Sequence, residues 1–151
     1  MLFYDEILLW LFVMNIGIVF GAGIYEARII VSEWANSPST YRWPDTGQKF
    51  WVFVTTVPLT ILCLANLIAA YFFHGVGGDW WLISSIIIVI ERIFTFSYFI
   101  PKGLKLQQGT ESISKPQLKK MVTQWKHLNY IRQIITLMAW ILALIAFSLI
   151  I

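Results

Sequence analysis

The sequence predicts an all-α integral membrane protein built as a four-helix bundle. Of its 151 residues, 58% are hydrophobic and 13% are charged, whereas about a quarter of the residues in a soluble domain are charged. The apolar residues gather in four segments, and about 20 apolar helical residues cross a hydrocarbon core roughly 30 Å thick. We therefore expect one membrane domain over residues 1–151, with spans at about 7–32, 50–73, 80–101 and 127–151.

The third span carries Glu91 and Arg92 near its middle. An unpaired charge at that depth costs about 3 kcal/mol on insertion scales, so both side chains must face protein or water. Adjacent helical residues project about 100° apart, which disfavours a pair between these two neighbours. We expect Glu91 to meet Arg132 or Arg28, and Glu26 to meet Arg92 or Arg28.

The first span is predicted to be a retained helix with close-packing glycines. Asp5 and Glu6 precede it, whereas a signal peptide has a basic region there. Gly17 and Gly21 form a GxxxG motif, with Gly23 nearby. Small residues at this spacing let another helix approach closely.

The second span contains Pro58, which removes one backbone hydrogen bond. Thr55 and Thr56 are expected to satisfy the backbone groups that the proline frees. Asn66 lies deeper, and a buried asparagine in a membrane helix usually makes an interhelical hydrogen bond. A contact from Asn66 to a ligand is the alternative. The glycine-rich segment His74–Asp79 is short, so the second and third spans should form an antiparallel hairpin.

The third span is expected to end at Pro101, before a polar segment. Ser114 and Pro116 then mark a helix start. Apolar residues follow with helical spacing and alternate with lysines; they are Leu118, Met121, Val122 and Trp125. This pattern predicts a basic amphipathic helix before the fourth span, suited to lie on an anionic membrane surface.

Basic residues in the loops indicate the orientation in the membrane. The two long loops carry Arg42, Lys49, Lys102, Lys105, Lys115, Lys119, Lys120 and Lys126. The termini and the short turn carry no lysine or arginine. The positive-inside rule predicts cytoplasmic long loops and both termini on the non-cytoplasmic side, in the inner (plasma) membrane of a bacterium. The same placement argues against nucleic-acid binding, and Trp34 and Trp43 are typical interfacial anchors.

Residue counts restrict the redox and metal chemistry that we expect. Cys63 is the single cysteine, which excludes an intramolecular disulfide and a CxxC redox pair. His74 and His127 are the two histidines, and the predicted topology puts them on opposite sides of the membrane. We expect neither a metal site nor a bound cofactor.

The predicted topology brings polar residues together in the cytoplasmic half of the bundle. The candidate catalytic residues are Glu91, Glu26, Arg92 and Arg132. The candidate substrate-binding residues are Tyr98, Thr95, Arg28, Asn129, Asn66, Trp43 and Trp125. A glutamate could remove a carbon-bound proton while an arginine stabilises the resulting enolate. The same charges could instead form an ion network that sets the helix register.

Four stretches carry a resemblance to a known family: GAGIYEARIIVSEW, FWVFVTTVPLTILCLANLIAAYF, ERIFTFSYFIPKGLKLQ and WKHLNYIRQIITLMAWILALIAFSL. The last contains a tryptophan, Asn129 and Arg132. Together they resemble the small four-span proteins of the anthrone-oxygenase-like family. The resemblance implies a four-helix bundle. In fungal members it implies cofactor-independent oxidation of a polycyclic anthrone to an anthraquinone.

Three functions are compatible with these observations. The first is an oxygenase-like enzyme acting on an apolar aromatic substrate. The second is a non-enzymatic membrane subunit, or a protein that binds a lipid or a quinone-like small molecule. The third is a small proton-coupled exporter, although arginines inside the spans would repel a cationic substrate. All three place the chain in the lipid bilayer, and all are compatible with a homo-oligomer.

Overall fold

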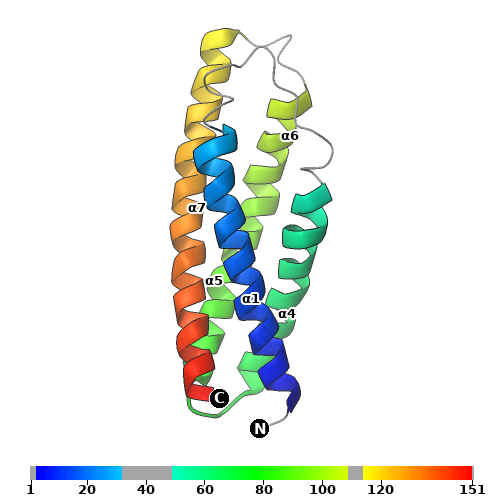
Figure 1. The fold of residues 1–151 in the computed structure, drawn as a ribbon, viewed down its shortest axis with the longest axis vertical. Helices are drawn as coiled ribbons and strands as arrows, with labels where there is room; N and C mark the ends of the chain where they lie inside the picture. The colour runs from blue at the N-terminus through cyan, green and yellow to red at the C-terminus, as the bar shows by residue number, and fades with distance from the viewer. Residues whose placement is uncertain (1–2, 32–48, 109–113, 151) are drawn as a thin grey trace.

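The computed structural model describes residues 3–31, 49–108 and 114–150, and these residues form a bundle of long helices (Figure 1). Four helical stretches are long and apolar enough to cross a membrane. They are Phe3–Ile30, Trp51–Phe72, Gly78–Lys105 and Pro116–Ile150. The prediction of an all-helical protein with four spans is therefore confirmed for the described residues.

Each of the first three spans joins an α-helix to a π-helical turn. Helix α1 (Phe3–Tyr25) continues into η1 (Glu26–Ile30), and η2 (Trp51–Thr56) leads into α4 (Val57–Phe72). Helix α5 (Gly78–Phe94) continues through η3 (Thr95–Phe99) into α6 (Ile100–Gln108). The fourth span is the single helix α7 (Lys115–Ile150).

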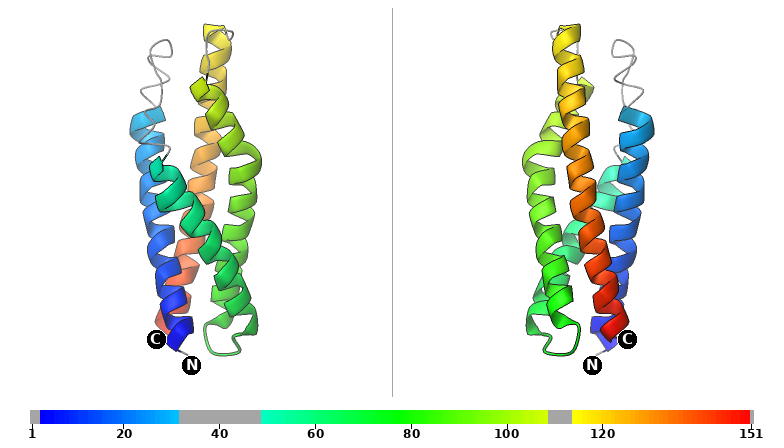
Figure 2. Two further views of the ribbon diagram at one scale, coloured as in Figure 1. Left: turned by 90° about the vertical axis from the view of Figure 1, so that its right-hand side faces the viewer. Right: turned by 90° about the vertical axis from the view of Figure 1, so that its left-hand side faces the viewer.

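Each of the four spans runs antiparallel to its neighbours in the sequence (Figure 2). The start of α1, the end of α7 and the turn between α4 and α5 lie at one end of the bundle (Figure 1). Gly77 has a φ of 89° in this turn, a left-handed conformation that glycine adopts without steric cost. The predicted hairpin of the second and third spans is confirmed.

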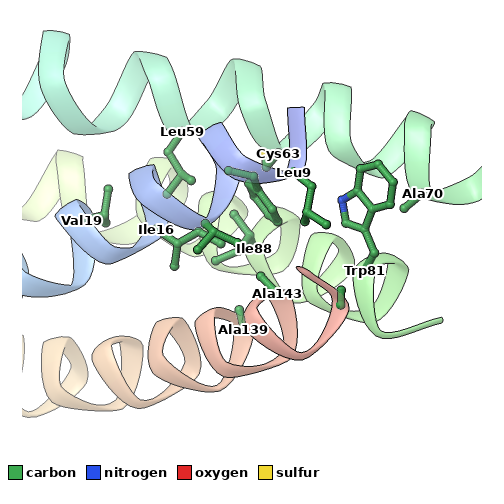
Figure 3. Packing of buried hydrophobic residues seen from close by; sticks show 13 residues of the cluster. Leu9, Ile16, Val19, Leu59, Cys63, Ala70, Trp81, Ile88, Ala139 and Ala143 are labelled. Carbon is green, nitrogen blue, oxygen red and sulfur yellow. The ribbon is translucent and has the colours of Figure 1, made fainter. Parts of the chain in front are cut away.

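The apolar core fills the half of the bundle that holds this turn (Figure 3). Large side chains of α1, α4 and α5 pack there against small side chains of α7. The fully buried members include Leu9, Phe12, Ile16, Leu59, Trp81, Ile88, Ala139, Ala143 and Ala146. The alanines let α7 approach closely, and the Ser84 hydroxyl donates a 2.7 Å hydrogen bond to the Ala139 carbonyl.

Asn66 makes the interhelical hydrogen bond that the sequence predicted. Its side-chain oxygen accepts a 2.9 Å bond from the indole N–H of Trp81, and its nitrogen donates to the Leu62 carbonyl at 2.8 Å. Both polar atoms of this buried amide are therefore used inside the core. The alternative role of Asn66 in binding a ligand is not supported.

The predicted GxxxG motif is used at one of its two glycines. The indole of Trp140 covers Gly17, and a Cβ added there would lie 3.0 Å from this ring. Gly21 faces open space, so the predicted pair does not form a packing surface. Gly23 takes the second close contact instead, because the Gln133 amide lies directly over its Cα.

The carbonyl that Pro58 frees is contacted by α1, not by the threonines that we expected. Asn15 donates a long 3.5 Å hydrogen bond to the carbonyl of Val54, four residues before the proline. Thr55 bonds instead to the carbonyl of Trp51 at 2.6 Å. A threonine hydroxyl in a helix reaches a carbonyl one turn before it, which explains the difference.

The third span does not end at Pro101, because the helix continues through α6 to Gln108. A proline removes one N–H and crowds the carbonyl four residues earlier, which bends a helix without necessarily stopping it. Both Pro58 and Pro101 come two residues after a π-helical turn, η2 and η3. The wider turns therefore coincide with the places where the prolines interrupt the regular bonding.

The basic segment before the fourth span is the first part of α7, a continuous helix of 36 residues. Its predicted lipid-facing stripe is turned into the protein: Leu118, Val122 and Trp125 are buried against Val31 and Phe99. The stripe therefore forms a second, smaller core, and its apolar residues are not available to lie on a membrane surface.

We expect a Gly23→Leu substitution to lower the free energy of unfolding by about 1 to 3 kcal/mol, because the larger side chain overpacks the contact with Gln133. Gly21→Leu is the matched control and should leave stability nearly unchanged, since Gly21 faces open space. Unfolding in mixed micelles measures both variants. Equal stability of the two variants would contradict this packing of α1 on α7.

Candidate functional site

A buried cluster of charges lies where α5 meets η3. Arg92 donates two hydrogen bonds to the Glu91 carboxylate, from Nε to Oε2 at 2.6 Å and from Nη2 to Oε1 at 2.8 Å. The Thr95 hydroxyl adds a third bond to Oε1 at 2.8 Å. Glu91 is 1% exposed, so both oxygens of a fully buried carboxylate are engaged.

The expectation that Glu91 and Arg92 would not pair with each other is wrong. Their Cα–Cβ bonds diverge by about 100° around the helix, but the arginine side chain is long enough to curve back. A bidentate pair is also the strongest way for a guanidinium to bind a carboxylate. In an apolar bundle this gain outweighs the strain of pairing neighbours.

Arg132 reaches the same cluster from α7. Its Nε lies 3.8 Å from Glu91 Oε1, and its Nη1 donates a long 3.4 Å bond to the Thr95 hydroxyl. Its guanidinium carbon lies 4.5 Å from the centre of the Phe99 ring, a distance at which cation and ring attract each other. The predicted meeting of Arg132 and Glu91 is confirmed, but both polar contacts of Arg132 are long.

Beside this cluster is a cavity of about 260 Å³, which we call the inner pocket. All three π-helical turns contribute to its wall. Its lining residues are Glu26, Trp51, Val52, Thr56, Thr95, Phe99, Ile100, Gly103, Leu104, Trp125 and Arg132. The wall is mostly aromatic and apolar, and it carries one carboxylate and one guanidinium.

A second cavity of about 420 Å³, which we call the lateral groove, lies between α7 and the α5–η3 segment. It is lined by Glu91, Phe94, Ser97, Tyr98, Phe99, Leu128, Ile131, Arg132 and Ile135. Phe99 and Arg132 line both cavities. These two side chains are therefore the wall that the inner pocket and the lateral groove share.

The structure brings together several of the residues that the sequence singled out. Glu26, Thr95, Trp125 and Arg132 line the inner pocket, whereas Glu91 and Tyr98 line the lateral groove. These six residues come from three of the four spans, so their convergence depends on the bundle.

Other predicted site residues lie elsewhere. Arg92 faces a hollow between α4 and α5, and Arg28 is exposed at the end of the first span. Asn129 is fully buried on α7 and lines neither the inner pocket nor the lateral groove. Trp43 lies outside the described residues.

Trp125 lines the inner pocket, and its indole N–H is buried. Among the residues that the structure describes, the indole N–H of buried Trp125 has no hydrogen-bond partner. Buried polar atoms in native proteins nearly always have one, from protein, water or ligand. Trp125 and Arg132 are seven residues apart, two helical turns, so both reach the pocket from one face of α7.

Sequence reasoning missed the π-helical turns and several residues of the pocket wall. Trp51, Thr56 and Phe99 line the pocket but were not predicted. Pro58 and Pro101 were a usable signal, because each follows one of the turns closely. π-helical turns are rare and occur frequently at functional sites.

Across the described ranges, no group of three or more histidine, cysteine, aspartate or glutamate side chains could hold a metal ion. The lining of the inner pocket offers one guanidinium, one carboxylate and aromatic surfaces. This chemistry suits an organic molecule with an acceptor oxygen.

Comparisons with protein-family models, with curated proteins and with solved structures return no match for this chain. The resemblance to the anthrone-oxygenase-like family therefore stays a prediction.

We expect Glu91→Gln to lower the free energy of unfolding by about 3 to 5 kcal/mol, because it leaves the Arg92 guanidinium buried without its counter-charge. Adding Arg92→Gln should restore part of this loss, since the double variant removes the guanidinium whose two hydrogen bonds to Glu91 were lost. Unfolding in mixed micelles measures the free energy of unfolding of the wild type, the two single variants and the double variant. Lys119→Gln, which removes an exposed charge from α7, is the control. Additive effects of the two substitutions would contradict a coupled pair.

Proposed function

We propose that this membrane protein binds an apolar aromatic or quinone-like small molecule in the inner pocket. Arg132 carries the proposal, because it lines the pocket while its contacts to Glu91 and Thr95 are long. Glu91 is already neutralised by the bidentate bonds from Arg92. The Arg132 guanidinium can therefore donate to an acceptor oxygen of a ligand.

The walls of the pocket support the same class of ligand. Trp51, Phe99 and Trp125 offer aromatic surfaces. Pockets for small molecules typically combine an apolar lining with a few polar groups that orient the ligand. A flat ring with a carbonyl or phenolic oxygen fits this combination.

We assign the pocket to the cytoplasmic half of an inner (plasma) membrane. The support is the charge distribution: Lys49, Lys102, Lys105, Lys119 and Lys120 lie towards the end of the bundle that holds α6 and the start of α7 (Figure 1). The positive-inside rule puts such an end in the cytoplasm. The beginning of α1 and the end of α7 would then face the other side.

Arg132→Gln should weaken binding of a 1,4-naphthoquinone by about tenfold or more, because a hydrogen bond from a charged group contributes about 1.5 to 3 kcal/mol. Arg132→Lys, which keeps the charge, should lose less affinity. Trp125→Phe should weaken binding severalfold, because the smaller ring removes part of the aromatic wall of the pocket. Fluorine NMR with a fluorinated naphthoquinone and protein in lipid nanodiscs measures the dissociation constants.

Lys119→Gln is the control for these variants, because it removes an exposed charge from the same helix. Native mass spectrometry of gently solubilised protein tests the ligand class independently. A co-purifying aromatic molecule would support the proposal. No binding of the naphthoquinone to the wild type, together with a stable complex with another chain, would favour the membrane-subunit function.

A second candidate function is oxygenase-like catalysis, because Glu26 lines the same pocket as Arg132. Of the two glutamates considered as the base, Glu26 suits the role better, since both oxygens of Glu91 accept hydrogen bonds from Arg92 and Thr95. Glu26 would take an acidic carbon-bound proton, and Arg132 would stabilise the enolate. Dioxygen would then oxidise the ring carbon, so that an anthrone and dioxygen give an anthraquinone and water.

Glu26→Gln should lower anthrone oxidation by about 10²–10⁴-fold while naphthoquinone binding is kept, because the amide cannot accept the proton. Oxygen uptake by nanodiscs containing anthrone measures the rate, with protein-free nanodiscs giving the spontaneous reaction. Glu6→Gln, at the opposite end of α1, is the control. Naphthoquinone binding without anthrone oxidation by the wild type would leave the binding function and exclude this activity.

A further inference from the structure

The lateral groove opens on the outer surface of the bundle. Phe94 and Ile131 both line it, and each is 54% exposed. In a four-span membrane protein, large apolar side chains exposed along the middle of the helices contact lipid. The mouth of the lateral groove therefore faces the bilayer.

The inner end of the groove differs from its mouth. Arg132 and Phe99 lie there, and they also line the inner pocket. Glu91 contributes to the groove as well, but its charge is compensated by two hydrogen bonds from Arg92. The groove therefore runs from an apolar, lipid-facing mouth to a cationic end.

The boundary between the groove and the inner pocket consists of two side chains that stack. The Arg132 guanidinium carbon lies 4.5 Å from the Phe99 ring centre, and the polar contacts of Arg132 are 3.4 Å and 3.8 Å long. Because these contacts are long, the acceptor oxygen of a ligand could replace them and keep the guanidinium hydrogen-bonded. A rotation of these two side chains would join the cavities without moving a helix.

We propose that the lateral groove is the entry route by which a ligand dissolved in the bilayer reaches the inner pocket. The inference rests on the proposed function and narrows its ligand class. The ligand is an apolar molecule that partitions into lipid and carries an acceptor oxygen at one end. Its oxygen leads along the groove to Arg132, because this guanidinium is the cation among the described lining residues and its contacts to Glu91 and Thr95 are long.

A bulky side chain in the groove should slow entry and exit equally. Ile131→Trp and Ile135→Trp narrow the groove at its mouth and further in, respectively. The matched control is Ile134→Trp, because Ile134 is 59% exposed on the same helix and lines neither the inner pocket nor the lateral groove. All three variants gain the same indole.

Fluorine NMR exchange of an alkyl-substituted fluoronaphthoquinone, with protein in lipid nanodiscs, measures both rates. We expect association and dissociation to slow about tenfold in the two groove variants, a typical range for variants of one site. The dissociation constant should stay within about twofold of the wild-type value, because an obstacle on a route changes rates and not the equilibrium. Ile134→Trp should exchange like the wild type.

The possible failures are distinguishable. If the wild type binds the probe and both groove variants exchange as fast as Ile134→Trp, the entry route is wrong and the proposed function stands. If the groove variants change the dissociation constant through one rate alone, with association as fast as in Ile134→Trp, the route is also wrong. If the wild type does not bind the probe, the proposed function fails and the route fails with it.

Discussion

The structure depends on the need to neutralise charges inside an apolar bundle. A guanidinium or carboxylate at this depth costs several kcal/mol unless it is paired and hydrogen-bonded. Glu91 and Arg92 meet this need with two short bonds of their own, and Thr95 adds a third. Because this pair is complete within one helix, Arg132 is not required to complete it. The Arg132 guanidinium therefore lines the inner pocket without being needed for the Glu91–Arg92 pair.

Helix α7 contributes to two different parts of the bundle, the larger apolar core and the part that contains the inner pocket. Towards its end it presents Ala139, Ala143 and Ala146, which are fully buried and let the helices pack closely. Towards its start it presents Trp125 and Arg132, which line the inner pocket. The π-helical turns of the other three spans lie around this part, and all contribute to the inner pocket. A closely packed core thus supports a cavity at the other end.

Sequence reasoning identified much of the site but not its pairing. Glu26, Thr95, Trp125 and Arg132 were predicted as site residues and line one pocket, because charged and polar residues inside apolar spans have few places to point. Arg28 and Asn66 were misplaced, since helical periodicity alone does not distinguish an exposed face or a core hydrogen bond from a pocket. The Glu91–Arg92 pair was missed because side-chain length overrides the angle between neighbouring Cβ atoms.

Hydropathy by itself determined the number of spans, their antiparallel order and the place of the tight turn, because a bilayer accepts only long helices whose backbone bonds are internal. It also determined that the buried charges must converge. Only the tertiary structure decided which glycines of the first span contact another helix. Gly23 lies under the Gln133 side chain of α7, whereas Gly21 faces open space. The tertiary structure decided, too, that Leu118, Val122 and Trp125 face protein and not lipid. The physical reason is that an apolar stripe is about as stable against lipid as against protein. Which of the two it contacts therefore depends on which helix lies beside it.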